Sequence, residues 1–363
     1  MSIKSVDAIP VSLPFEVWGP KSAFAGRPRS MDILLVRVET HDGVVGWGEA
    51  FGYAIWPATR VALEHLIKPM ATGADEADIA GITMDIQKKL HLVGRTGAAV
   101  FGLSGLDIAL WDIAGKRAGK PLCELLGVVR NTRLPAYASL VRYGTAALVS
   151  ENARRAVDHG YRAIKLHEID VEFVRIAREA VGPDIRLMMD TNCPWTVEEA
   201  KGIAERVKPY DLHWLEEPVW PPEDFAGLAE VRRASNVLIS AGENAMSLKH
   251  FEQMFDAGAV DVAQPSVTKI GGVSEMIRIA QLASERGVRL VPHSPYFGPG
   301  LLATLHMAAT YTHETMIEIS FMALGASPLG DAVTALHGEI AVPPGPGLGR
   351  DPDMAVVEKY RVQ

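Results

Sequence analysis

Hydrophobic and polar positions change rhythm along the chain, and its N-terminal part begins with strand-like alternation. Three segments alternate in this way, namely residues 3–13, 33–40 and 44–49. The turn His41-Asp42-Gly43 separates the last two, and an Asp-Gly pair in this position predicts a hairpin. Three later segments carry apolar residues at helical spacing, namely 58–70, 75–90 and 100–118. Strands followed by helices predict an α+β capping domain over residues 1–130.

Beyond this region, short apolar runs alternate with amphipathic helical segments. Eight such runs are found, at 134–138, 163–167, 186–190, 212–216, 238–243, 260–265, 289–293 and 316–320. This alternation predicts parallel strands joined by crossover helices, and eight units favour a closed, TIM-like (β/α)-barrel over residues 131–325. On periodicity alone, an open doubly wound sheet is the alternative. Residues 326–363 follow the last predicted strand, and we expect them to pack back on the capping domain.

Charge and cysteine content narrow the class of protein. The 363-residue chain has a formal net charge of -8 and no clustered basic run, which argues against a nucleic-acid partner. Two cysteines, Cys123 and Cys193, are too few for a disulfide framework. The first ten residues lack a signal-peptide pattern, and we find no run of about 18 apolar residues typical of a membrane span. We therefore expect a cytoplasmic protein with no membrane partner.

Acidic residues end three successive predicted strands. They are Asp190, Glu216 and Glu243. Because a barrel places the carboxyl ends of its strands at one face, these side chains are expected to converge there. Buried like charges repel one another and require a cation. Oxygen ligands with room for water suit Mg²⁺, and no Cys/His spacing favours zinc. A magnesium ion in such a site can stabilise the enediolate that forms when a carboxylate loses its α-proton.

Several motifs resemble those of one family in order and spacing over nearly the whole chain. They are Gly105-Leu106-Asp107-Ile108-Ala109-Leu110-Trp111-Asp112-Ile113-Ala114-Gly115-Lys116, Asp190-Thr191-Asn192, Trp214-Leu215-Glu216-Glu217-Pro218, Gly242-Glu243-Asn244 and Lys269-Ile270-Gly271-Gly272. The sequence is similar to the mandelate racemase/muconate lactonizing branch of the enolase superfamily, whose chemistry pairs magnesium with a Lys or His base. The resemblance implies Asp190, Glu216 and Glu243 as the metal ligands and Mg²⁺ as the cofactor.

The resemblance also implies acid and base residues on both sides of the substrate. Lys165 matches the first lysine of the family's Lys-x-Lys pair, and His167 departs from the usual second lysine. A histidine there keeps a base that titrates near neutrality. His293 matches the opposing acid/base histidine. The aspartate that holds this histidine in the family is replaced by Ser266, whose hydroxyl could still orient one ring nitrogen.

Other residues have implied roles closer to the substrate. Glu318 matches the acid that hydrogen-bonds the developing enediolate, and Lys269 matches the lysine that muconate-lactonizing relatives use as the opposing base. Asn192 and the cap-loop residues Trp18, Arg27 and Tyr53 are candidates for substrate binding, since such loops can close over a polar anion.

The leading hypothesis is a lyase that dehydrates a small-molecule sugar acid. A racemase or epimerase using His167 and His293, a cycloisomerase using Lys165 and Lys269, and an inactive metal-binding relative are the alternatives. We also expect a homo-oligomer.

Overall fold

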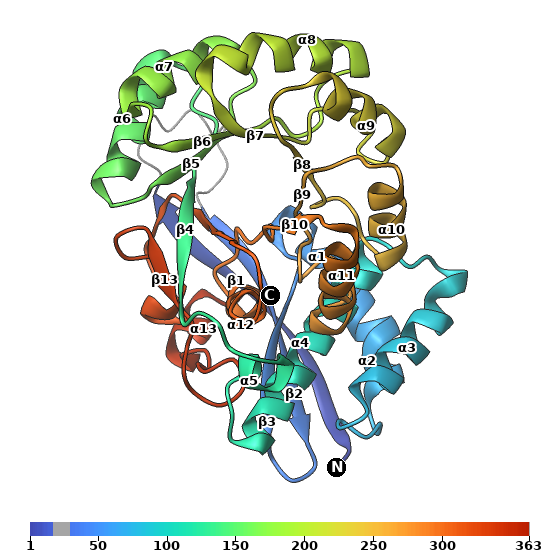
Figure 1. Cartoon of the computed structure of the whole chain (residues 1–363). Helices are drawn as coiled ribbons and strands as arrows, with labels where there is room; N and C mark the ends of the chain where they lie inside the picture. The colour runs from blue at the N-terminus through green and yellow to red at the C-terminus, as the bar shows by residue number, and fades with distance from the viewer. Residues whose placement is uncertain (17–29, 363) are drawn as a thin grey trace.

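The structure is a computed structural model that describes residues 1–16 and 30–362. Its sheets follow the two sequence regions (Figure 1). The first sheet has the order β12-β1-β2-β3 and contains β1 (Ile3–Glu16), β2 (Ser30–Thr40) and β3 (Val45–Ala50), with the short β12 (Ala323–Leu324) at its edge. The three predicted N-terminal strands and the hairpin after Thr40 are confirmed, with β1 and β2 each longer than predicted.

The helices of the capping region follow these strands. The segment predicted as one helix over 58–70 is three consecutive pieces, α1 (Trp56–Ala62), a π-helical turn (Leu63–Ile67) and α2 (Lys68–Ala71). α3 (Ile79–Lys89) and the long α4 (Ala98–Ala118) match the other two predictions. α5 (Leu122–Leu126) leads into the barrel. α4 is long and apolar enough to cross a membrane, but 83% of its apolar window is buried, which is typical of a core helix.

Two glycines allow α4 to lie directly on β3. A Cβ at Gly46 would lie 2.2 Å from the Ala109 carbonyl oxygen, and one at Gly48 would lie 1.9 Å from that of Gly105. Any side chain on this face of the strand would push the helix away. The alternation of Gly46 and Gly48 therefore sets the distance between sheet and helix.

The motif on α4 acts as an anchor for other segments. The Asp107 carboxylate accepts a hydrogen bond from the backbone N–H of Ser274, at 3.0 Å, in the first turn of a barrel helix. Asp112 accepts backbone hydrogen bonds from Trp47 and Leu348, at 2.9 and 2.8 Å. These carboxylates join the capping region to the barrel and to the C-terminal segment.

The second sheet has nine strands, of which eight are parallel and follow the order β10-β9-β8-β7-β6-β5-β4-β11, with β11 paired to β4. The strands are β4 (Arg133–Ser139), β5 (Ala163–Leu166), β6 (Arg186–Asp190), β7 (Leu212–Glu216), β8 (Ile239–Ala241), β9 (Val262–Ala263), β10 (Arg289–Leu290) and β11 (Ile317–Ser320).

The crossover helices are α6 (Ala146–Asp158), α7 (Val171–Val181), α8 (Val197–Val207), α9 (Phe225–Ala234), α10 (Leu248–Asp256), α11 (Val273–Arg286) and α12 (Pro299–Ala308). α6 to α10 form an outer arc around the strands (Figure 1). The predicted barrel is confirmed.

Side chains connect β10 and β11, between which no ladder is found in the described residues. The Thr315 hydroxyl donates to the Leu290 carbonyl at 2.9 Å, and the backbone N–H of Ser294 donates to Glu318 at 3.2 Å. A residue of the candidate site therefore helps to close the barrel.

The C-terminal segment contacts both sheets. β13 (Glu339–Ala341) pairs antiparallel with β4, and Val357 of α13 (Met354–Tyr360) lies in a hydrophobic cluster with residues of β1 and β2. The proposed limits at residues 130 and 325 stay a prediction.

Candidate active site

The period-two pleat of the barrel strands explains how the polar residues come together. A layer of apolar side chains fills the barrel interior and includes Tyr137, Ala163, Met188, Trp214, Val291 and Met316. Two positions after each of these stands a residue of the site, and these are Ser139, Lys165, Asp190, Glu216, His293 and Glu318. Because residues i and i+2 of a strand share one face, the site forms the next layer above the apolar one.

Three carboxylates converge in this layer. One oxygen from each of Asp190, Glu216 and Glu243 lies within 4.8 Å of the others. Burial and the adjacent Asp190 raise the pKa of Glu216 to about 8, which reflects crowding of like charges. Asp190 Oδ2 is buried and receives no well-aligned hydrogen bond from the described residues, so it can accept a cation. An all-oxygen donor set of this spacing fits Mg²⁺.

Lys165 lies at the centre of the same cluster, with its side chain fully buried. Its Nζ is 2.9 Å from Glu216, 3.1 Å from Asp190 and 2.8 Å from Glu318. Burial would lower the pKa of Lys165, but the carboxylates around it outweigh burial and hold the pKa well above its usual value. A divalent cation on Asp190 and Glu216 would oppose this effect and make the amine easier to deprotonate.

His167 is held beside Lys165 by the loop after β4. Its Nδ1 contacts the Leu140 carbonyl, and Arg142 Nε donates to the carbonyl of His167 itself at 2.6 Å. Its Nε2 lies 3.2 Å from Asp190 Oδ2. Burial lowers the pKa of His167, but the charge and contact of Asp190 prevail and raise it. A carbonyl can only accept a hydrogen bond, so Nδ1 carries the hydrogen of the neutral ring and Nε2 is the nitrogen free to act as a base.

His293 approaches the cluster from β10. Its Nε2 lies 2.9 Å from Glu243 Oε2, and its Nδ1 lies 3.0 Å from the Ser266 hydroxyl. The Ser266 hydroxyl also contacts that of Tyr296. His293 and Lys165 thus contact different members of the carboxylate cluster.

Glu318 links the Lys165 side of the site to the His293 side. It accepts a hydrogen bond from the Ser139 hydroxyl at 2.8 Å and one from the Ser294 backbone N–H. Burial favours a higher pKa for Glu318, but Lys165 and His293 outweigh it and lower the pKa.

Neighbouring side chains hydrogen-bond the carboxylates and hold them in place. Trp214 Nε1 donates to Glu216 at 2.8 Å, and Asn192 Nδ2 donates to Asp190 Oδ1 at 3.0 Å. Glu217 accepts two hydrogen bonds from Asn244, at 3.0 and 2.9 Å. Such partners fix the ligands of a metal in most sites.

A cavity of about 620 Å³ opens above the cluster. Its lining includes His167, Asn192, Glu243, Lys269, His293 and Glu318 from the barrel, and Met31, Phe51 and Tyr53 from the capping region. Lys269 Nζ lies 5.0 Å from the centre of the Phe51 ring, and the Tyr53 hydroxyl donates to the Pro295 carbonyl at 3.0 Å. The candidates Trp18 and Arg27 lie outside the described residues.

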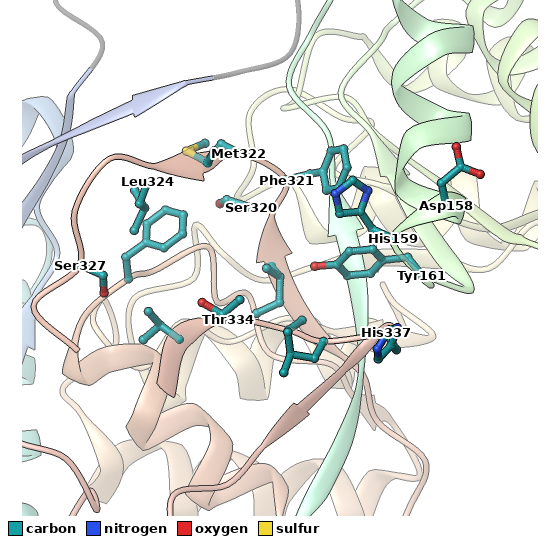
Figure 2. A pocket seen from close by; sticks show the side chains of 16 residues that line it. Asp158, His159, Tyr161, Ser320, Phe321, Met322, Leu324, Ser327, Thr334 and His337 are labelled. Atoms are coloured by element: carbon teal, nitrogen blue, oxygen red, sulfur yellow. The ribbon is translucent and has the colours of Figure 1, made fainter. Parts of the chain in front are cut away.

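A second cavity, of about 580 Å³, lies on the other face of β11 (Figure 2). There Phe321 packs edge-on against His159 and Tyr161, and Thr334 and His337 line the C-terminal side. The carboxylates of the first cavity do not line it. Glu318 lines the first cavity and Ile319 the second, because successive residues of a strand point to opposite faces, whereas Ser320 and Met322 line both.

Four residues of the site were missed by the sequence interpretation, and one of them, Ser139, ends β4 as Glu216 ends β7. Trp214 could have been found, because it precedes Glu216 by two positions on the same strand face. Tyr296 and Arg142 lie in loops, where spacing gives no indication of direction.

Comparison with known proteins supports one family. Residues 18–127 match the mandelate racemase/muconate lactonizing enzyme N-terminal domain, and residues 148–356 match the enolase C-terminal domain-like family. A D-galactarolactone cycloisomerase from Agrobacterium fabrum is 32% identical over 91% of each chain, as is an arabinonate dehydratase from Saccharolobus solfataricus. A racemase from Streptomyces coelicolor, solved with bound magnesium, is 28% identical with a TM-score of 0.85 and covers 99% of this chain and 100% of its own.

Proposed function

Since the chain belongs to the mandelate racemase/muconate lactonizing enzyme family of the enolase superfamily, we propose that it is a magnesium-dependent dehydratase of sugar acids. The observation that carries the proposal is the position of Lys165, which contacts Asp190, Glu216 and Glu318 at once. A base at this point lies beside both the cation-binding oxygens and the group that would bind a substrate carboxylate. The dehydratases and cycloisomerases among its relatives act, by their names, on sugar acids or their lactones.

Magnesium bound by Asp190, Glu216 and Glu243 would supply positive charge to a substrate carboxylate and stabilise the enediolate. Lys165 would donate a hydrogen bond to the same carboxylate, and Glu318 would donate one in its protonated form. Either Lys165 or His167 removes the α-proton, because both nitrogens lie on the β5 side of the cluster. His293 then donates a proton to the β-hydroxyl, and the C–O bond breaks with loss of water. The resulting enol takes up a proton to give a 2-keto-3-deoxy acid.

The cavity supports a polar substrate. Its lining combines Arg142, Asn192 and Lys269 with the apolar Phe51 and Met322. These side chains offer donors for hydroxyl groups along a chain that extends away from the cluster.

A cycloisomerase is the second candidate function, because Lys269 Nζ lies in the cavity together with His293. Lys269 could donate a proton to the face of the same enediolate opposite Lys165. No water would be lost in that reaction.

A panel of sugar acids and their lactones, incubated with magnesium, tests both functions. Formation of a 2-keto acid from an open-chain acid supports dehydration, and conversion of a lactone without loss of water supports cycloisomerisation. In deuterated solvent, the α-position of recovered substrate should carry deuterium where proton removal is reversible, and the carbon next to the keto group of a 2-keto acid product should carry it. Turnover of a substrate without α-proton exchange and without a primary isotope effect, in a reaction limited by chemistry, would contradict both. Absence of turnover over the whole panel would favour an inactive metal-binding relative.

A further inference from the structure

The partner of His293 is a pair of hydroxyl groups. Ser266 Oγ lies 3.0 Å from His293 Nδ1 and also contacts the Tyr296 hydroxyl. The Tyr296 hydroxyl itself lies 3.4 Å from Nδ1, a long contact. All three side chains are buried, with Ser266 fully enclosed. No described carboxylate contacts Nδ1.

We propose that Ser266 and Tyr296 act as one unit that positions His293, with Tyr296 acting through Ser266. The kinetic consequences of this unit rest on the proposed function, whereas its hydrogen-bond geometry is independent of that function. Ser266 is the direct partner of Nδ1, and Tyr296 fixes the direction of the serine hydroxyl.

Ser266 alone would hold the ring weakly, because the hydrogen of a serine hydroxyl rotates about the Cβ–Oγ bond and has no fixed direction of its own. Tyr296 lacks this freedom. It lies three residues after His293, its ring packs edge-on against the imidazole at 6.0 Å, and its side chain is 6% exposed. Burial also raises the pKa of Tyr296 well above its usual value, so its hydroxyl stays protonated. The tyrosine therefore gives the serine a second, fixed partner.

A hydroxyl pair differs chemically from a carboxylate. A carboxylate only accepts hydrogen bonds, whereas a hydroxyl both donates and accepts. Nδ1 consequently has a partner whether or not it carries a proton. The ring can keep Nε2 directed toward the cavity, as its contact with Glu243 at 2.9 Å indicates, before and after it gives a proton to the substrate.

Kinetics of five variants test the unit. Ser266→Ala removes the direct partner and should lower kcat about tenfold, with KM changed less than about twofold, as expected for the loss of about one hydrogen bond. Tyr296→Phe should lower kcat about threefold. The double variant should resemble Ser266→Ala, because residues in one network are not additive. In a Ser266→Asp background, Tyr296→Phe should have no further effect, since a carboxylate needs no second group to direct it.

Tyr311→Phe is the matched control. It also removes a buried tyrosine hydroxyl, but one with no hydrogen-bond partner among the described residues and outside the cavity lining. It should leave kcat unchanged. A double variant whose loss equals the product of the single losses would overturn the claim that Tyr296 acts through Ser266. Unchanged kcat in both single variants would overturn the whole proposal.

A second measurement needs no turnover. Nitrogen-15 NMR of histidine-labelled, magnesium-loaded protein reports both ring nitrogens of His293, and His293→Asn assigns their signals. Ser266→Ala and Tyr296→Phe should shift the Nδ1 signal, and Tyr311→Phe should not. Shifts of this kind in a protein that turns over no acid would contradict the proposed function and leave the positioning unit intact. Unmoved Nδ1 signals would overturn the unit even in an active enzyme.

Discussion

The β5 and β10 sides of the site hold their proton-transfer groups in different ways. On the β5 side, Lys165 contacts three carboxylates within 3.1 Å. On the β10 side, His293 has one carboxylate at Nε2 and hydroxyl groups at Nδ1. Three carboxylates fix the lysine, whereas the histidine has one carboxylate and, at Nδ1, only neutral hydroxyl groups. Loss of Lys165 should therefore lower overall stability more than loss of His293 does, although His293 also contacts a proposed metal ligand, Glu243.

The largest effect is expected where both sides meet, at the metal ligands. Asp190→Asn should weaken magnesium binding and activity by more than about 100-fold, since even outer-shell partners of a metal account for 10- to 100-fold. Calorimetric titration with magnesium and assay of the best substrate measure the two losses. Asp224→Asn, at the start of α9, is the control and should change neither, because its carboxylate only caps a helix. Normal magnesium affinity in Asp190→Asn would refute the assignment of this ligand.

Lys165→Met tests the β5 side, where the lysine contacts three carboxylates. It should abolish turnover, and in metal-free protein it should lower the free energy of unfolding by about 3–5 kcal/mol, because three buried carboxylates lose their cation. Magnesium should restore much of this stability. Denaturant titration with and without magnesium measures the difference, and Lys201→Met, which removes a partly exposed lysine, is the control. Equal stability of variant and parent without magnesium would show that the two sides do not differ as described.

His293→Asn tests the β10 side. Dehydration should fall by about 10²–10⁴-fold, the range for loss of a general acid, whereas stability should change less than in Lys165→Met. Exchange of the α-proton with deuterated solvent should persist, since the β5 side removes that proton. Proton NMR of the recovered substrate measures exchange. If the enzyme is a two-base racemase, exchange should remain for one enantiomer only, and loss of all exchange would assign proton removal to His293.

Glu49 extends the comparison to a buried carboxyl with no cation beside it among the described residues. Burial raises its pKa from 4.5 to about 8, and its one hydrogen bond comes from the Gly300 backbone N–H, at 2.8 Å. Between these pH values the folded protein keeps the proton and the unfolded chain releases it. The parent should therefore lose stability as pH rises from about 4.5 to about 8, by an amount on the order of a few kcal/mol.

Glu49→Gln should remove this dependence. The variant should match the parent near pH 5 and exceed its stability near pH 8, as thermal unfolding across this range can measure. Glu151→Gln, at a 58% exposed side chain, should follow the parent at every pH. Parallel pH profiles of Glu49→Gln and parent would mean that Glu49 is ionised in the folded protein.

Sequence could predict those features that follow from strand period and strand order. Asp190 and Glu216 end neighbouring strands, so a parallel sheet brings them together without further information. The hydroxyl partner of His293 is different, because Tyr296 approaches Ser266 from a loop whose path depends on packing between β10 and α12. The π-helical turn at Leu63–Ile67 was likewise missed, since its apolar spacing resembles that of an ordinary helix. Tertiary contacts decide such positions, and spacing does not report them.

The anchoring role of Asp112 has a consequence for synthesis of the chain. This carboxylate joins Trp47 to Leu348, and Val357 helps to cover the first sheet. The capping region leaves the ribosome early, yet part of its hydrophobic face has no cover until the C-terminal segment has emerged. Exposed apolar surface of this kind promotes aggregation of partly made chains. We expect nascent chains that stop before residue 348 to need a chaperone more than the finished protein does.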